Sequence, residues 1–90
     1  MAFVKNIQGS ADNNPPAGYS SWKEYWEVNK KRRFSYCSCT RCSRLAEVGG
    51  HVKKIVGSNE WYIVPLCYAC NSSSNTSTFE VLDEDLLRVV

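Results

Sequence analysis

Two runs rich in apolar and β-branched residues, separated by a polar turn, predict a β-hairpin in the second half of the chain. The first strand is expected over residues 51–56 and the second over 61–64, with Gly57-Ser58-Asn59-Glu60 as the turn. Pro65 is expected to end the second strand, because proline cannot donate a hydrogen bond to a neighbouring strand. A further short strand is predicted at residues 79–82.

A helix is predicted to begin at Ser21. Ser21 and Glu24 fit the S-x-x-E capping box, in which each side chain accepts a hydrogen bond from a free backbone N–H at the helix start. Trp22, Tyr25 and Trp26 then recur at helical spacing. We expect this aromatic face to pack as core; the alternative is a platform on which nucleic-acid bases stack.

The first 18 residues are predicted to form an extended arm, because Pro15-Pro16 and Ala17-Gly18 oppose helix on both sides. Residues 19–90 then form a single small α+β domain, since 90 residues cannot supply two cores. A hydrophobic content of 43 % and a charged content of 22 % are ordinary for a globular chain. No apolar run is long enough for a membrane span or a secretory signal, so we expect a cytoplasmic protein that does not bind membranes.

A domain of this size needs additional stabilisation from disulfides or a bound metal, because its hydrophobic core contributes only a few kcal/mol. Cys39-x2-Cys42 and Cys67-x2-Cys70 have the spacing with which two short loops hold one tetrahedral Zn²⁺, and we predict a structural zinc ion on these four thiolates. Cys37 offers an alternative, since Cys37-x4-Cys42 is also an allowed spacing. The odd number of cysteines argues against a disulfide framework. Four-cysteine iron is a further, less favoured alternative.

Basic residues gather in the middle of the chain. Residues 23–54 hold nine Lys or Arg against three Glu, although the net charge of the whole chain is only +2. Such a stretch could contact a phosphate backbone, or it could be a solvated face of mixed charge. The candidate nucleic-acid contacts are Lys30, Lys31, Arg32, Arg33, Arg41, Arg44, Lys53 and Lys54.

The order of a cysteine knuckle (residues 36–44), a hairpin and a second cysteine pair at a helix start resembles a treble-clef zinc finger. With Gly49-Gly50-His51-Val52 on the first strand and Cys67-x2-Cys70-Asn71 after the second, it is similar to the HNH endonuclease superfamily. The resemblance covers residues 37–75 and implies a treble-clef fold to which an N-terminal helix is added. It also implies that His51 corresponds to the general base that activates water. Gly50 and Asn71 stand where the family places ligands of a catalytic metal.

Three functions follow from these observations. The favoured one is a structural zinc domain of HNH-like shape that binds nucleic acid without cleaving it, because glycine supplies no ligand to a catalytic metal. The second is a metal-dependent endonuclease with His51 as general base; His51 is alternatively a packed histidine or a zinc ligand. The third is a protein-interaction module that exposes Trp22, Trp26 and Trp61.

Overall fold

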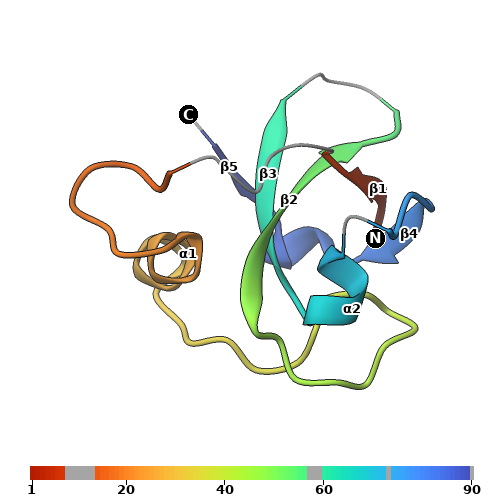
Figure 1. Ribbon diagram of the computed structural model, residues 1–90, viewed down its shortest axis with the longest axis horizontal. Helices are drawn as coiled ribbons and strands as arrows, with labels where there is room; N and C mark the ends of the chain where they lie inside the picture. Colours follow the sequence, from red (N-terminus) through yellow and green to blue (C-terminus); the bar gives the residue numbers. More distant parts are fainter. Residues whose placement is uncertain (8–13, 57–59, 73, 90) are drawn as a thin grey trace.

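The computed structural model describes residues 1–7, 14–56, 60–72 and 74–89 (Figure 1). The elements in chain order are β1 (Ala2–Asn6), α1 (Trp22–Lys30), β2 (Val48–Lys54), β3 (Trp61–Leu66), α2 (Tyr68–Asn71), β4 (Phe79–Val81), the 3₁₀ turn η2 (Asp83–Asp85) and β5 (Leu87–Arg88). Together they form a small α+β domain. Its five-stranded antiparallel sheet has the order β4-β1-β2-β3-β5.

The predicted hairpin is present as β2 and β3, but β2 begins three residues earlier and ends two residues earlier than predicted, and β3 ends two residues later. β2 begins at Val48 and includes the two glycines, and β3 continues through Pro65 to Leu66. Pro65 lies opposite Gly49, but its carbonyl accepts a hydrogen bond from the backbone N–H of Ser38, at 2.8 Å. The polar groups of this residue therefore point away from β2, and the missing N–H leaves no gap in the β2–β3 ladder. The predicted turn at 57–59 lies outside the described residues.

The start of the chain belongs to the sheet, in contrast to the extended arm expected for residues 1–18. Strand β1 pairs with β2 on one side and β4 on the other, and Val4 is completely buried. The Asn6 side chain is also buried, and its Nδ2 donates to the carbonyl of Cys70 at 2.8 Å. Residues 8–13 of the expected arm lie outside the described part of the chain.

Helix α1 begins as predicted. Ser21 is the N-cap, and its hydroxyl accepts a hydrogen bond from the backbone N–H of Glu24 at 3.0 Å. The Glu24 carboxylate accepts in turn from the N–H of Ser20, at 2.7 Å. Trp26 is 1 % exposed, which confirms that part of the aromatic face packs as core. It also means that the exposed Trp26 required by the protein-interaction hypothesis is wrong.

The two faces of the sheet are covered by different elements, with α1 on one side of the β2–β3 hairpin and α2 on the other (Figure 1). His51 and Ile63, paired across the hairpin, lie on the α1 side. The opposite face carries the main core, which continues into the sulfur atoms of the cysteine loops. That core contains Val4, Cys37, Val52, Val64, Leu66, Cys67, Val81 and Leu86. Among the described residues, no helix has the length and apolar character to cross a bilayer.

Candidate metal centre

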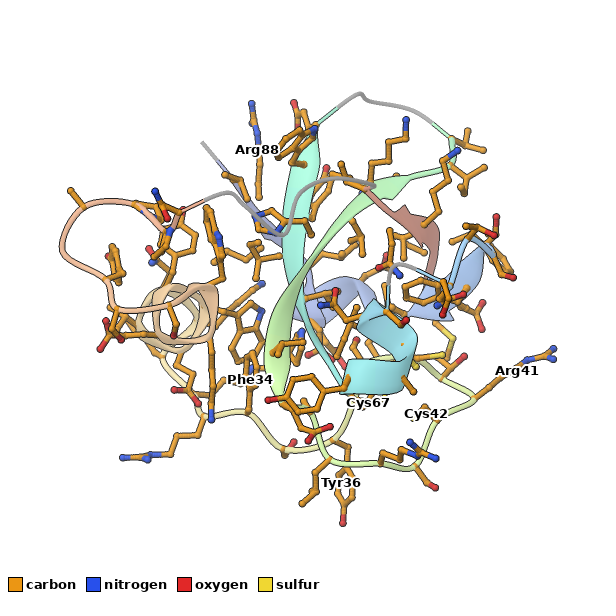
Figure 2. The ribbon with its side chains drawn as sticks, viewed as in Figure 1. Phe34, Tyr36, Arg41, Cys42, Cys67 and Arg88 are labelled. Atoms are coloured by element: carbon orange, nitrogen blue, oxygen red, sulfur yellow. The ribbon has the colours of Figure 1, made fainter. Side chains whose placement is uncertain are left out.

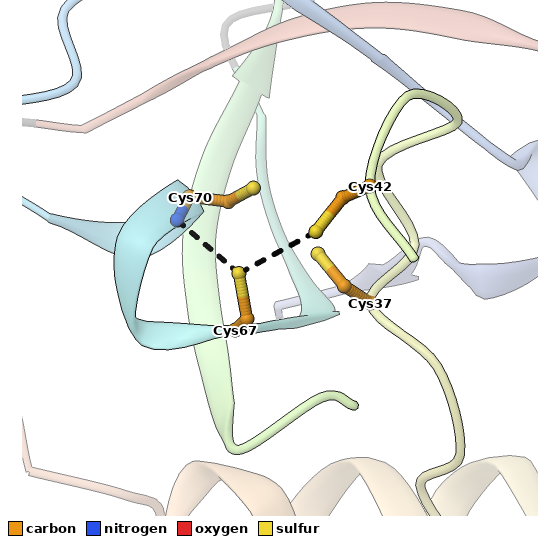
Figure 3. Close-up of side chains that lie close together, drawn as sticks. All are labelled: Cys37, Cys42, Cys67 and Cys70. Atoms are coloured by element: carbon orange, nitrogen blue, oxygen red, sulfur yellow. Dashed lines mark hydrogen bonds between the residues drawn. The ribbon is translucent and has the colours of Figure 1, made fainter. Parts of the chain in front are cut away.

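Four cysteine sulfurs meet between the knuckle and the start of α2 (Figure 3). The Sγ atoms of Cys37, Cys42, Cys67 and Cys70 all lie within 4.8 Å of one another. The Cys42 and Cys67 sulfurs are 3.7 Å apart. Four sulfurs held at about 2.3 Å from a tetrahedral Zn²⁺ are about 3.8 Å from each other, so the spacing is compatible with one metal ion in the centre of the group.

The fourth sulfur comes from Cys37, whereas the sequence favoured Cys39. The residues of this segment are fixed by hydrogen bonds to different parts of the fold: the N–H of Cys37 donates to the carbonyl of Arg44, and that of Ser38 to Pro65, each at 2.8 Å. Cys39 forms an isolated antiparallel bridge with Val81 of β4. This bridge ties Cys39 to the sheet edge, and the sulfur of Cys37 occupies the place that spacing alone assigned to Cys39.

The other two sulfurs are placed by the turn that opens α2. Cys67 is the N-cap of this short helix, and its sulfur lies 3.5 Å from the backbone N of Cys70, which donates to it. Both sulfurs of the C-x2-C pair therefore face the knuckle from one helical turn. The predicted pairing of Cys67 with Cys70 at a helix start is present in the structure.

The pKa values of three of the thiols are shifted, and not all in the same direction. Burial raises the pKa of Cys37 to about 11, and burial together with the neighbouring Cys67 raises the pKa of Cys70. Burial alone would also raise the pKa of Cys67, but hydrogen bonds from the Cys70 backbone and from the surrounding thiols lower it overall. Cys67 is thus a sulfur whose pKa the surrounding hydrogen bonds lower. Because the remaining ligands must also be deprotonated, metal binding releases protons.

His51 is enclosed by aromatic rings on the opposite face of the sheet from this centre. Its ring centroid is 4.6 Å from that of Trp22 and 6.0 Å from that of Trp61, both in edge-to-face geometry. The residue is 6 % exposed, and its Nε2 has no hydrogen-bond partner among the described residues. The surroundings are those of a packed histidine, and the cysteine group does not include it.

Gly50 and Asn71 face each other on the α2 side. An added Cβ at Gly50 would lie 2.5 Å from Cδ1 of Leu66 and 2.8 Å from Oδ1 of Asn71. The two positions that the resemblance would match to ligands of a catalytic metal are therefore adjacent, but one lacks a side chain and has no space for one. His51, which the resemblance would match to the general base, lies on the other face of the sheet.

Burial lowers the pKa of His51 below its ordinary value of 6.5, and this predicts an acid-sensitive contribution to stability. The unfolded chain takes up a proton near pH 6.5 while the folded chain stays neutral, so stability is complete above pH 6.5 and falls as the pH drops below it. Urea unfolding of the zinc-saturated protein at pH 7.5 and 5.5 should show a larger loss for the natural chain than for His51→Phe. Both chains share the acid sensitivity of the thiolates, so equal losses would contradict the prediction.

Of the eight basic residues predicted to contact nucleic acid, four are paired within the fold or half-buried, and four are exposed without an ion pair to the described residues. Lys30 and Arg32 are used inside the fold: Lys30 Nζ donates to the carbonyl of Glu84 at 3.1 Å, and Arg32 forms an ion pair with Asp85. Lys54 lies 5.1 Å from the ring centroid of Tyr62, and Lys53 is half-buried. The exposed members without an ion pair among the described residues are Lys31, Arg33, Arg41 and Arg44.

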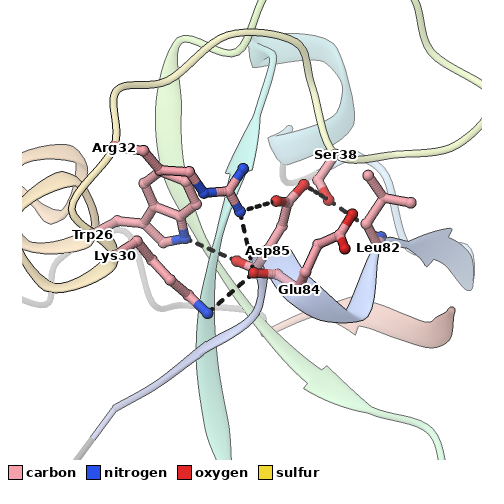
Figure 4. Close-up of polar contacts among 7 residues, drawn as sticks. All are labelled: Trp26, Lys30, Arg32, Ser38, Leu82, Glu84 and Asp85. Carbon is pink, nitrogen blue, oxygen red and sulfur yellow. Dashed lines mark hydrogen bonds and ion pairs between the residues drawn. The ribbon is translucent and has the colours of Figure 1, made fainter.

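A polar network that the sequence did not indicate connects α1, η2 and the knuckle (Figure 4). Buried Asp85 accepts from Arg32 through one carboxylate oxygen and from the Ser38 hydroxyl through the other, the latter at 2.8 Å. Its carbonyl accepts from Trp26 Nε1, also at 2.8 Å. Ser38 stands directly after Cys37, so this network helps to hold the knuckle. Nothing in the Asp-Glu-Asp sequence of η2 predicts that the Asp85 carboxylate is buried.

No protein-family model matches the chain, and neither does any of the curated proteins or solved structures with which it was compared. The chain is therefore defined by its fold and its cysteine cluster: a small α+β domain with a candidate site for one metal ion.

Proposed function

We propose that this protein is a structural zinc domain with treble-clef, HNH-like geometry that binds nucleic acid without cleaving it. The four-sulfur group supports the zinc assignment, because tetrahedral thiolate sites are typical of zinc. The treble-clef assignment is supported by the order of the elements along the chain: the knuckle, the β2–β3 hairpin, and then α2 with Cys67 as its N-cap.

The surroundings of His51 favour binding over cleavage. Phosphodiester hydrolysis needs a base that reaches the substrate and a cation on the reacting oxygens. Here the candidate base is buried between Trp22 and Trp61, and Gly50 offers no ligand on the other face. The endonuclease alternative would require both groups to rearrange. Intact plasmid after incubation with Mg²⁺, Mn²⁺ or Ni²⁺ is the expected result.

The observation that carries nucleic-acid binding is a set of exposed cations on one segment that form no ion pair with the described residues. Lys31, Arg33, Arg41 and Arg44 all lie between α1 and β2, in the loop that runs along the lower edge of the molecule in Figure 1. Figure 2 shows Arg41 extending away from the body of the protein. Cations that are not used in the fold can release counterions from a phosphate backbone.

Salt-dependent binding tests this proposal. Fluorescence anisotropy with labelled oligonucleotides should show affinity that falls as salt is raised. The paired substitution Arg41→Gln with Arg44→Gln should weaken binding and reduce the slope of log K against log salt by about 1.4 to 1.8 for two lost phosphate contacts. A zinc ion with four thiolates carries a net negative charge, which Arg41 and Arg44 help to offset. Each variant must therefore be shown to retain one zinc per chain.

The matched control removes the same charge elsewhere. Lys5→Gln with Lys23→Gln changes exposed side chains on β1 and α1 that form no ion pair within the described chain, and it should leave the slope nearly unchanged. No binding to single-stranded or duplex DNA at low salt would exclude this function.

A further inference from the structure

Large apolar side chains are exposed beside the metal centre. Tyr36 is 65 % exposed, and Leu45 and Tyr68 are each 63 % exposed. Tyr36 and Leu45 lie opposite each other in an isolated antiparallel bridge. Figure 2 shows Tyr36 pointing outward at the lower end of the molecule, below Cys42 and Cys67. We call Tyr36, Leu45 and Tyr68 the zinc-end platform.

Hydrogen bonds of Glu47 place Tyr68 beside the segment that carries Leu45. The carboxylate of Glu47 accepts from the backbone N–H of Tyr68 at 3.2 Å, and the N–H of Glu47 donates to Leu66 at 2.9 Å. Glu47 stands two residues after Leu45 in an extended segment, so the two side chains leave the backbone on the same side. Tyr68 is therefore next to the segment that carries Leu45.

Two cations lie in the loop that carries Tyr36 and Leu45, although Arg44, next to Leu45 in an extended segment, projects to the opposite side from it. Arg44 immediately precedes Leu45, and Arg41 lies in the same loop; both are exposed and form no ion pair within the described chain. Glu47, the nearby acid, already caps the first turn of α2. A partner that fits must offer flat apolar faces together with negative charges that Arg41 and Arg44 can neutralise.

Building on the proposed function, we propose that the zinc-end platform binds single-stranded nucleic acid by stacking unpaired bases on Tyr36 and Tyr68. Single strands present base faces and phosphates together, whereas a duplex buries its base faces in the stack. Tyr36 precedes Cys37 and Tyr68 follows Cys67, so a metal that joins these cysteines also fixes the backbone from which both rings project. Rings held in place before binding lose less conformational entropy when a base stacks on them.

The experiment compares zinc-loaded variants with fluorescein-labelled oligo(dT) and with a duplex of the same length. Tyr36→Ala and Tyr68→Ala should each weaken oligo(dT) binding by about 5- to 150-fold, the range for one lost base–aromatic stack. Tyr36→Phe and Tyr68→Phe keep the ring and should bind nearly as tightly as the natural chain. One zinc per chain and an unchanged circular-dichroism spectrum will establish that each variant is folded.

The outcomes separate this inference from the function on which it rests. Loss of binding in the Arg41→Gln, Arg44→Gln variant alone, with both alanine variants unaffected, would leave nucleic-acid binding in place and overturn the stacking platform. Tighter binding to the duplex than to oligo(dT), or to an acidic peptide than to either, would also overturn it. Absence of binding to every nucleic acid would overturn both proposals.

Discussion

Cys37→Ser will lose its zinc and its folded structure, while Cys39→Ser will keep both. Cys37 contributes one of the four sulfurs that lie within 4.8 Å of one another, and Cys39 does not. Serine binds zinc far more weakly than thiolate, so the loss of a ligand removes most of the free energy that a structural zinc ion contributes. Elemental analysis and circular dichroism on the purified variants will measure the two effects.

The two variants are matched, since each replaces one cysteine of the same knuckle and the residues stand two positions apart. Cys39 is half-buried and packs beside the core, so Cys39→Ser is expected to cost only a small part of the stability. The reverse pattern, with zinc retained by Cys37→Ser and lost by Cys39→Ser, would restore the ligand set that the C-x2-C spacing predicted.

Removal of the metal will unfold the natural chain. A structural zinc site of this type contributes about 10–16 kcal/mol at neutral pH, comparable with or larger than the total stability of most small domains. Cys37 and Cys67 are also members of the main core. Without a metal ion, this part of the core is held together only by weak contacts between thiols, such as that between Cys42 and Cys67. Treatment with a strong chelator followed by dialysis should abolish the helix and sheet signals in circular dichroism.

Two controls make this result specific. The same chelator saturated with zinc should leave the spectrum unchanged, and addition of zinc to the unfolded chain under reducing conditions should restore it. The isolated protein should also be colourless, because four-cysteine iron absorbs visible light. A native spectrum in material shown to be free of metal would refute the structural role of the ion.

Local chemistry made part of the fold predictable. The Ser21 cap is confirmed because a capping box is formed by residues three positions apart, independently of the rest of the chain. The hairpin and the short α2 followed from apolar runs bounded by turn residues and from the poor helix propensity of the serine-rich stretch after Cys70. The three cysteines that the prediction and the structure share were identified from spacing alone.

The remaining features depend on contacts between distant segments. β1 was missed because one of its two buried positions, Asn6, is polar and breaks the expected apolar pattern that Val4 begins. The Asn6 side chain is stabilised by a hydrogen bond to the carbonyl of Cys70, far away in the sequence. The choice between Cys37 and Cys39 depends on the bridge to Val81, far away in the sequence. Which face of β2 receives His51 depends on strand pairing, and the sequence of β2 alone does not determine it.

The crowding at Gly50 opposes the introduction of a metal-binding side chain at this position. A single exchange of this glycine for aspartate or histidine would force the new Cβ against Leu66 and Asn71, at 2.5 and 2.8 Å. Leu66 is fully buried in the core, so it has little room to move. Installing hydrolytic activity in this scaffold would require changes at Gly50, Leu66 and Asn71 together and a base to replace the buried His51, and the change at Gly50 alone would destabilise the protein.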